Sequence, residues 1–213
     1  MRIVRQPSYI AVPWKNGGGI THEAIRVPAQ GDAFRWRVSI AQIDASGPFS
    51  DFAAYRRFMV LLKGSGVLLK FTERAEGSAR SSEPRLRELR RIGDMEEFDG
   101  GLATHCDLVN GPCTDLNLMV SKELADVRAW VESLAEPRAA KLASGRSLLV
   151  FPIDAAVEVR YADEVCVLER WDLALISESG QAIVRVAAAG GQSEGRGESN
   201  GGGMVFLAEL PAE

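Results

Sequence analysis

Short runs in which apolar residues alternate with polar ones, or follow one another directly, dominate the chain. Such runs, bounded by turn-forming residues, predict β-strands. The predicted strands span residues 35–41, 57–62, 67–71, 147–152, 156–161, 164–168, 173–176, 182–187 and 204–210. Turn sequences rich in glycine, asparagine and aspartate separate several of them, at residues 63–66, 99–101 and 110–112. This punctuation is typical of an antiparallel sandwich or barrel, so the sequence predicts an all-β fold.

Residues 121–142 fit two patterns. Leu124, Val127 and Leu134 lie at helical spacing, whereas Val127, Ala129 and Val131 alternate as in a strand. We favour a strand here. Two segments, 72–84 and 190–203, are low in complexity, and seven of the fourteen residues in the second are glycine. Because the second segment cannot bury apolar surface, we expect a mobile loop there.

Composition and charge narrow the class of protein. The 213 residues are 46% hydrophobic and 25% charged, with a formal net charge of -4. These values are ordinary for a globular protein and give no electrostatic reason to bind nucleic acid. The arginine-rich run 85–91 also contains Glu88, which favours a solvated loop or strand face. We therefore expect no nucleic-acid partner.

The sequence also predicts a cytoplasmic protein without a membrane partner. No apolar run approaches the length that spans a bilayer, and Pro7, Tyr9 and Pro13 interrupt the segment where a signal peptide needs an apolar core. The chain has three cysteines and no Cys-x-x-Cys spacing. An odd number without metal-ligand spacing predicts three reduced thiols rather than a disulfide framework or a zinc knuckle.

Residues 13–19 read Pro-Trp-Lys-Asn-Gly-Gly-Gly. Glycines expose their backbone N–H groups, and Lys15 and Asn16 add side-chain donors beside them. Such a loop suits a small anion, most simply a carboxylate, held by one charge and several amides. The alternative is a tight turn at a sheet edge, with Trp14 packed in the core.

Three further motifs accompany this loop: Trp36-Arg-Val-Ser-Ile-Ala41, Gly47-Pro-Phe-Ser50 and Asp115-Leu-Asn-Leu-Met119. As a set, over roughly residues 1–120, they make the chain resemble the HutD/Ves family of bacterial cupin-like proteins. The resemblance implies an RmlC-like β-barrel or jelly roll and an association with histidine utilisation, without an assigned enzymatic activity. It also implies a sensor or governor of flux, whose suspected ligand is a pathway acid such as N-formylglutamate or urocanate.

A weak internal repeat indicates how the barrel is organised. Residues 57–70 and 147–160 each read as an apolar strand, a turn and an alternating strand, and a further β pattern follows each. The rhythm resembles that of a cupin, with Trp171 where a cupin usually has glycine. We expect two cupin-like halves, residues 1–120 and 121–213, packed as one compact unit. A single barrel with extra strands would leave much the same pattern.

The metal ligands that cupin enzymes usually carry are missing from the sequence. The chain has two histidines, His22 beside Glu23 and the distant His105, so no His-x-His pair exists. A facial set of imidazole and carboxylate ligands cannot then be assembled in the usual way. We expect no metal and no cofactor; a site built from His22, Glu23 and His105 is the alternative. No serine or cysteine lies in an activating motif, so no catalytic residue is proposed.

A binding site is easier to derive. On an extended strand Arg37 and Ser39 share one face, as do Asp115 and Asn117, and of the consecutive Arg56 and Arg57 only one can enter a pocket. The predicted ligand-binding residues, in part implied by the motif positions of the family, are Lys15, Asn16, Gly17, Gly18, Glu23, Arg37, Ser39, Arg57, Asp115 and Asn117.

Three functional hypotheses follow. The first is a protein that binds a small carboxylate metabolite and regulates histidine catabolism, without established catalysis. The second is a metal-dependent cupin enzyme, an isomerase or oxygenase. The third is a protein-interaction module. The protein assembly that we consider for this chain is a homodimer.

Overall fold

The computed structural model describes residues 1–14, 17–28, 30–31, 33–73, 83–177, 179–187 and 203–212. Lys15, Asn16 and most of the two low-complexity segments lie outside these ranges, so the predictions made for them stay predictions.

Two compact units make up the chain. One is Ser8–Asp126, and the other combines Met1–Pro7 with Val127–Glu213. The division therefore falls after residue 126 rather than after residue 120. Residues 1–7 belong with the C-terminal unit because strand β1 (Arg2–Val4) pairs with β17 (Leu173–Ile176). The two units are called here the N-terminal unit and the C-terminal unit.

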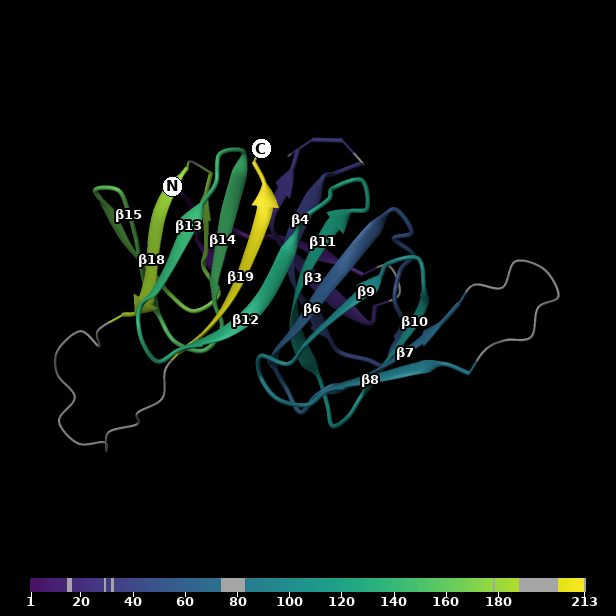
Figure 1. Cartoon of the computed structure of the whole chain (residues 1–213). Helices are drawn as coiled ribbons and strands as arrows, with labels where there is room; N and C mark the ends of the chain where they lie inside the picture. The colour runs from purple at the N-terminus through teal and green to yellow at the C-terminus, as the bar shows by residue number, and fades with distance from the viewer. Residues whose placement is uncertain are drawn as a thin grey trace, which may run out of the picture. The chain divides into compact units, whose positions relative to one another are not determined.

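The N-terminal unit contains two antiparallel sheets (Figure 1). The six-stranded sheet has the order β2 (Ile10–Pro13), β3 (Gly19–Val27), β4 (Trp36–Ile43), β11 (Cys113–Ser121), β6 (Tyr55–Lys63) and β9 (Met95–Asp99). The four-stranded sheet has the order β5 (Gly47–Pro48), β10 (Ala103–Leu108), β7 (Val67–Thr72) and β8 (Arg85–Leu89).

The C-terminal unit is built in the same way. Its five-stranded sheet has the order β1, β17, β14 (Arg146–Pro152), β19 (Gly203–Pro211) and β12 (Arg128–Leu134). Its four-stranded sheet has the order β13 (Arg138–Leu142), β18 (Gly180–Val186), β15 (Val157–Tyr161) and β16 (Glu164–Leu168). A 3₁₀ helix, Gln6–Ser8, follows β1.

The all-β prediction is confirmed, since the described ranges contain no α-helix. Each predicted strand is found, and β12 and β13 show that the ambiguous segment 121–142 forms strands. The arginine-rich run 85–91 is also mostly a strand, β8, whose residues Arg85 to Glu88 are exposed. In the described part of the chain, no helix is long and apolar enough to cross a membrane.

The internal repeat corresponds to a shared topology. In the N-terminal unit β11-β6-β9 lie in one sheet and β10-β7-β8 in the other; in the C-terminal unit β19-β14-β17 and β18-β15-β16 take the same places. The turn before β9 has Gly93 at φ 89°, and the turn before β17 has Trp171 at φ 68°. Both backbone amides donate to the preceding hairpin, Gly93 to Leu61 O at 2.9 Å and Trp171 to Pro152 O at 3.0 Å. Trp171 thus adopts the left-handed conformation that its place in the repeat requires.

The interiors of the two units differ in polarity. Buried aliphatic residues from both sheets pack together in the C-terminal unit, among them Leu148, Val150, Val205 and Leu207. The N-terminal unit has a comparable cluster around Met59, Leu61, Val67 and Leu69. Cys106 and Cys113 are buried in that cluster as free thiols. The rest of the inner surface of the six-stranded sheet is polar, and the cavity described next lies against it.

Candidate functional site

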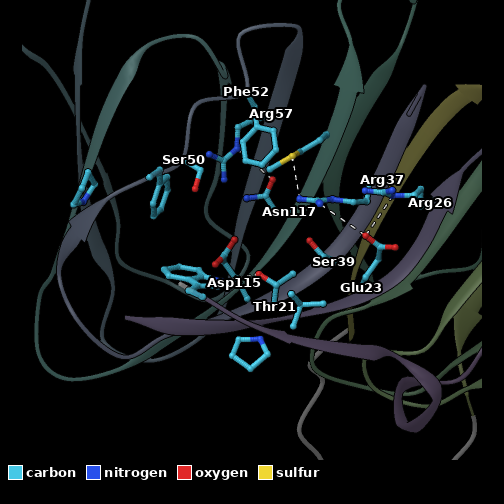
Figure 2. Close-up of a pocket in the computed structure, with 17 residues that line it drawn as sticks. Thr21, Glu23, Arg26, Arg37, Ser39, Ser50, Phe52, Arg57, Asp115 and Asn117 are labelled. Carbon is cyan, nitrogen blue, oxygen red and sulfur yellow. Dashed lines mark hydrogen bonds and ion pairs between the residues drawn. The ribbon is translucent and has the colours of Figure 1, made fainter. Parts of the chain in front are cut away.

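A cavity of about 590 Å³ lies in the N-terminal unit. This volume lies in the range of small-molecule sites. Strands β3, β4, β6 and β11 supply most of its polar side chains, and the segments 12–14 and 48–52 supply Ser50 and most of its apolar ones. Figure 2 shows side chains from these strands directed toward a common space. The lining residues are Val12, Pro13, Trp14, Thr21, Glu23, Arg26, Arg37, Ser39, Ala41, Pro48, Phe49, Ser50, Phe52, Arg57, Asp115, Asn117 and Met119.

The strand register arranges the polar residues in rows across the sheet. Directly opposed residues of neighbouring strands point to the same face. One row is Glu23, Ser39 and Asn117, and the next is Thr21, Ala41 and Asp115. The third row is Arg37, Met119 and Arg57. Because side chains alternate along each strand, all three rows open onto the cavity while Trp36 and Val38, both fully buried, pack on the other face.

A β-bulge in β3 brings one more charge to this face. The register between β3 and β4 shifts between Glu23 and Ile25. Residues an odd number of positions apart point to opposite faces of a regular strand, so Glu23 and Arg26 could not both line the cavity without this shift. Arg26 consequently lies opposite Arg37.

Arg57 is the most unusual of the lining residues. Its exposed fraction is 6%, and burial lowers the pKa of its guanidinium to about 10 despite the attraction of Asp115. Within the described part of the chain, its one hydrogen bond runs from Nε to Asn117 Oδ1 at 3.4 Å. The rings of Phe49 and Phe98 lie 4.9 and 5.0 Å from its Cζ. Among the described residues no carboxylate lies within 4 Å of this cation.

Asp115 faces the same cavity from β11. Its exposed fraction is 1%, and burial raises the pKa of its carboxyl group to about 7, against the opposing effects of Arg57 and the Asn117 amide. Atom Oδ2 of Asp115 is buried and has no hydrogen-bond partner in the structure as described. Cys106, whose thiol pKa is raised to about 12 by burial and by this carboxylate, is close enough to interact with it.

A second cationic group lies at the other end of the third row. Glu23 Oε2 is 3.8 Å from Arg37 Nη1 and 3.6 Å from Arg26 Nε, so it bridges both arginines (Figure 2). Arg37 Cζ lies 5.2 Å from the ring of Phe34 and 5.5 Å from that of Phe52. Burial lowers the pKa of Arg37, and its Nε has no hydrogen-bond partner in the described structure. The cavity thus has three arginines and two carboxylates among its lining residues.

The fold itself does not require these polar groups. The amides of Gly93 and Trp171 hold equivalent places in the two units and donate to Leu61 and Pro152, so Leu61 and Pro152 are equivalent positions. Arg57 and Leu148, each four positions earlier, are then equivalent as well. Pairing with these strands then matches Asp115 with Val205 and Asn117 with Leu207. In the C-terminal unit the matching positions belong to an aliphatic cluster. The same topology therefore forms around a polar interior in the N-terminal unit and around an aliphatic interior in the C-terminal unit. The polar interior contains unpaired buried groups, which lower the stability of the fold.

The structure brings together most of the predicted site residues. Glu23, Arg37, Ser39, Arg57, Asp115 and Asn117 all line the cavity, and Lys15 and Asn16 lie outside the described residues. Of the two consecutive arginines, Arg57 enters the cavity and Arg56 pairs with Glu97 at 3.2 Å.

Gly17 and Gly18 are not among the cavity-lining residues. Gly17, at φ 70°, donates from its amide to Trp14 O at 3.0 Å, which is the tight turn considered as the alternative. Trp14 itself lines the cavity, and its indole donates to Thr21 Oγ1 at 2.8 Å.

Several lining residues were not predicted, namely Arg26, Thr21 and the loop residues Phe49, Ser50 and Phe52. The Gly-Pro-Phe-Ser motif at 47–50 marks this loop in the sequence, but no periodicity assigns it to the cavity. Arg26 depends on the bulge and leaves no signal in the alternation.

The alternative metal site is not formed. His22 lies between two cavity-lining residues of β3, so its side chain points to the opposite face. His105, on β10, lies 3.2 Å from Asp107 and is half exposed. In the ranges that the structure describes, no three histidine, cysteine or acidic side chains are grouped so as to hold a metal ion.

Comparison with protein families decides the identity. The HutD family model matches residues 6–193. The chain belongs to the HutD family. A relative from Pseudomonas putida, described as an uncharacterized 21.2 kDa protein in the hutC 3′ region, is 33% identical over 164 residues, covering 76% of this chain and 78% of its own.

Solved structures extend the likeness over the whole HutD-family chain. A conserved protein of unknown function from Pseudomonas aeruginosa superposes with a TM-score of 0.77 at 28% identity, covering 99% of this chain and 98% of its own. HutD from Pseudomonas fluorescens superposes with a TM-score of 0.74 at 26% identity, covering 100% and 99%. The cupin oxalate decarboxylase of Bacillus subtilis, at 7% identity, shares the fold alone, with a TM-score of 0.61 over 100% and 77% of the two chains. The predicted cupin-like fold is thereby confirmed.

Proposed function

We propose that the cavity of the N-terminal unit binds a small carboxylate metabolite. The observation that carries this proposal is Arg57, a buried guanidinium with one 3.4 Å hydrogen bond and no carboxylate at ion-pair distance among the described residues. A buried charge without a partner is strongly unfavourable, whereas a guanidinium and a carboxylate form a bidentate, charge-assisted pair. A ligand carboxylate in the cavity supplies the ion-pair partner that Arg57 lacks.

The surroundings fit an anion of modest size. Arg37 at the other side of Met119 offers a second cation, and the two guanidinium groups repel each other, which contributes to the lowered pKa of Arg57. A monocarboxylate or dicarboxylate relieves this repulsion. The rings of Phe49, Phe52 and Trp14 provide apolar walls for the body of the ligand.

Membership of the HutD family supports a place in histidine catabolism. The Pseudomonas putida relative is described by its position beside hutC, and the structural neighbour from Pseudomonas fluorescens is named HutD. We propose a regulatory role, in which occupancy of the cavity reports the concentration of a pathway acid such as N-formylglutamate or urocanate. The absence of a metal-ligand cluster among the described residues gives the enzyme hypothesis no support from this site.

Calorimetric titration of both acids into three proteins tests the binding step. Wild type should bind at least one acid at millimolar concentration or below, and Arg57→Leu should weaken that binding by about a hundredfold, since it removes a buried charged partner. Arg56→Leu is the matched control, because Arg56 is the neighbouring arginine, is 33% exposed and pairs with Glu97. Equal affinities in all three proteins, or no binding to wild type, would contradict the proposal.

A further inference from the structure

Asp115 is not explained by an anion alone. The carboxylate that completes Arg57 is an acceptor, and so is Asp115 Oδ2, which is buried without a hydrogen-bond partner in the described structure. A purely anionic ligand would add a second acceptor, and when both are ionised a second negative charge, in the same cavity. Neither addition satisfies Oδ2 of the ionised carboxylate.

The donors nearest to Asp115 in the sheet leave its Oδ2 without a hydrogen bond in the described structure. Asn117 accepts from Arg57 through its Oδ1, and its side-chain amide forms a hydrogen bond with the Asp115 carboxyl group that leaves Oδ2 without a partner. The indole N–H of Trp14 is directed to Thr21 Oγ1. Within its own row Asp115 lies opposite Ala41, which has no polar side chain. Figure 2 shows the carboxylate of Asp115 on the opposite side of the open space from Arg37, with its oxygens directed into that space.

We propose that the ligand of this cavity carries, besides its carboxylate, an N–H or O–H group that donates a hydrogen bond to Asp115 Oδ2. This inference rests on the proposed carboxylate-binding function and narrows the ligand to a bifunctional class. Acylated amino acids carry both groups, with an amide N–H near the carboxylate. Heteroaromatic acids with a ring N–H also carry both, at a greater separation.

Donation to Asp115 couples binding to protonation. The charged and titratable side chains that face or lie near this carboxyl group are Arg57 on β6, Cys106 on β10, Arg37 on β4 and Glu23 on β3. Cys106 stays a neutral thiol at neutral pH because its pKa is raised. The ligand donor favours ionised Asp115, so it lowers the pKa of that carboxyl group relative to a ligand of equal charge that lacks the donor. Near pH 7 the donor-bearing ligand should therefore release more protons, or take up fewer, than its donor-free partner, and the preference for the donor-bearing ligand should weaken as the pH falls.

Two pairs of ligands that differ in the donor alone test the inference. N-formylglutamate is compared with 2-(formyloxy)glutarate, in which an ester oxygen replaces the amide N–H. Urocanate is compared with 3-(oxazol-4-yl)acrylate, in which a ring oxygen replaces the N–H and the second ring nitrogen is kept. For at least one pair, wild type should bind the donor-bearing member roughly ten- to a hundredfold more tightly, the fold-change of one charge-assisted hydrogen bond.

Variants of Asp115 then assign the difference to this residue. In Asp115→Ala the affinity ratio within that pair should fall to about one, while Asp115→Asn, which keeps a neutral acceptor, should retain part of it. Wild type alone gives an independent readout: in calorimetry at pH 7 in two buffers of different ionisation enthalpy, the donor-bearing ligand should release more protons, or take up fewer, than its donor-free partner.

The possible failures are distinguishable. If wild type binds both members of each pair equally, and Arg57→Leu still abolishes that binding, the donor inference is overturned and the carboxylate site stands. Greater proton uptake with the donor-bearing member than with its donor-free partner would also overturn the inference, since it means that the donor does not favour ionised Asp115. If wild type binds no member of either pair, the proposed function is overturned and the inference with it.

Discussion

Arg57 and Asp115 face one cavity from the adjacent strands β6 and β11, and burial shifts the pKa of each toward its neutral form. Their mutual attraction opposes the shift, but among the described residues the two side chains do not form an ion pair within 4 Å. Each retains an unmet need, Arg57 for an acceptor and Asp115 for a donor. Without a ligand, these two unmet needs lower the stability of the folded N-terminal unit, as is common at binding sites.

The first prediction concerns the pH dependence of stability. A carboxyl group whose pKa is raised on folding contributes stability that is full below its unfolded pKa near 4 and is lost as the pH rises through its folded pKa of about 7. Asp115→Asn cannot lose this proton. Relative to the variant, wild type should therefore lose about 2 to 3 kcal/mol of unfolding free energy between pH 5 and pH 8, as measured by urea denaturation.

Glu158→Gln is the control for that experiment. The carboxylate of Glu158 has its pKa lowered by Arg185 and Arg160, so it stays ionised in both folded and unfolded states from pH 5 to pH 8. Its stability difference from wild type should not change over this range. A pH-independent difference for Asp115→Asn as well would show that Asp115 is ionised throughout.

Strand alternation was enough to predict which polar residues share a face. The spacing of Arg37 with Ser39, and of Asp115 with Asn117, depends on the backbone of a single strand, and all four residues line the cavity. The same rule separated Arg57 from Arg56. The all-β class followed equally from local patterns, because short alternating runs and glycine-rich turns are properties of consecutive residues.

Features that depend on residues far apart in the sequence do not follow from local patterns. Which strands pair, and in what register, decides that Asn117 lies beside Ser39, and one residue of slip would reverse every side chain. The bulge that turns Arg26 toward the cavity leaves no mark in the sequence pattern. The place of residues 1–7 in the C-terminal unit is non-local for the same reason, since β1 pairs with a strand some 170 positions away.

The second prediction concerns the other cation of the cavity. Arg37→Ala should weaken binding of the carboxylate ligand by about ten- to a hundredfold, because Arg37 is a half-buried donor with an unpartnered Nε and a long contact to Glu23. The fold should be retained, as judged by an unchanged circular dichroism spectrum. Calorimetric titration gives the affinity.

Arg85→Ala is the matched control for Arg37. Arg85 also lies over an aromatic ring, 4.4 Å from that of Phe71, and also pairs with a glutamate, Glu96, at 2.6 Å. It belongs to β8 and does not line the cavity. Its loss should leave affinity unchanged; an equal loss of affinity in both variants would assign the effect of Arg37 to the fold.

The third prediction follows from the repeat. Replacing Arg57 and Asp115 together by leucine and valine, the residues at the matching positions 148 and 205 of the C-terminal unit, removes two buried charged or polar groups without leaving either one alone. Replacement of a buried ionic pair by apolar residues of similar volume is often neutral or stabilising by about 1 to 4 kcal/mol. We expect the double variant Arg57→Leu/Asp115→Val to unfold at a higher urea concentration than wild type and to bind no carboxylate.

The single variants make this result interpretable. Asp115→Val alone leaves Arg57 buried without its nearest counter-charge. Because an uncompensated buried charge is strongly destabilising, this single variant should be less stable than the double variant. Arg57→Leu alone leaves Asp115, which can take up a proton because its pKa is already about 7, and should be destabilised less. A double variant that unfolds at a lower urea concentration than both single variants would show that this polar pair stabilises the N-terminal unit, and that its presence there is a requirement of the fold rather than of a ligand.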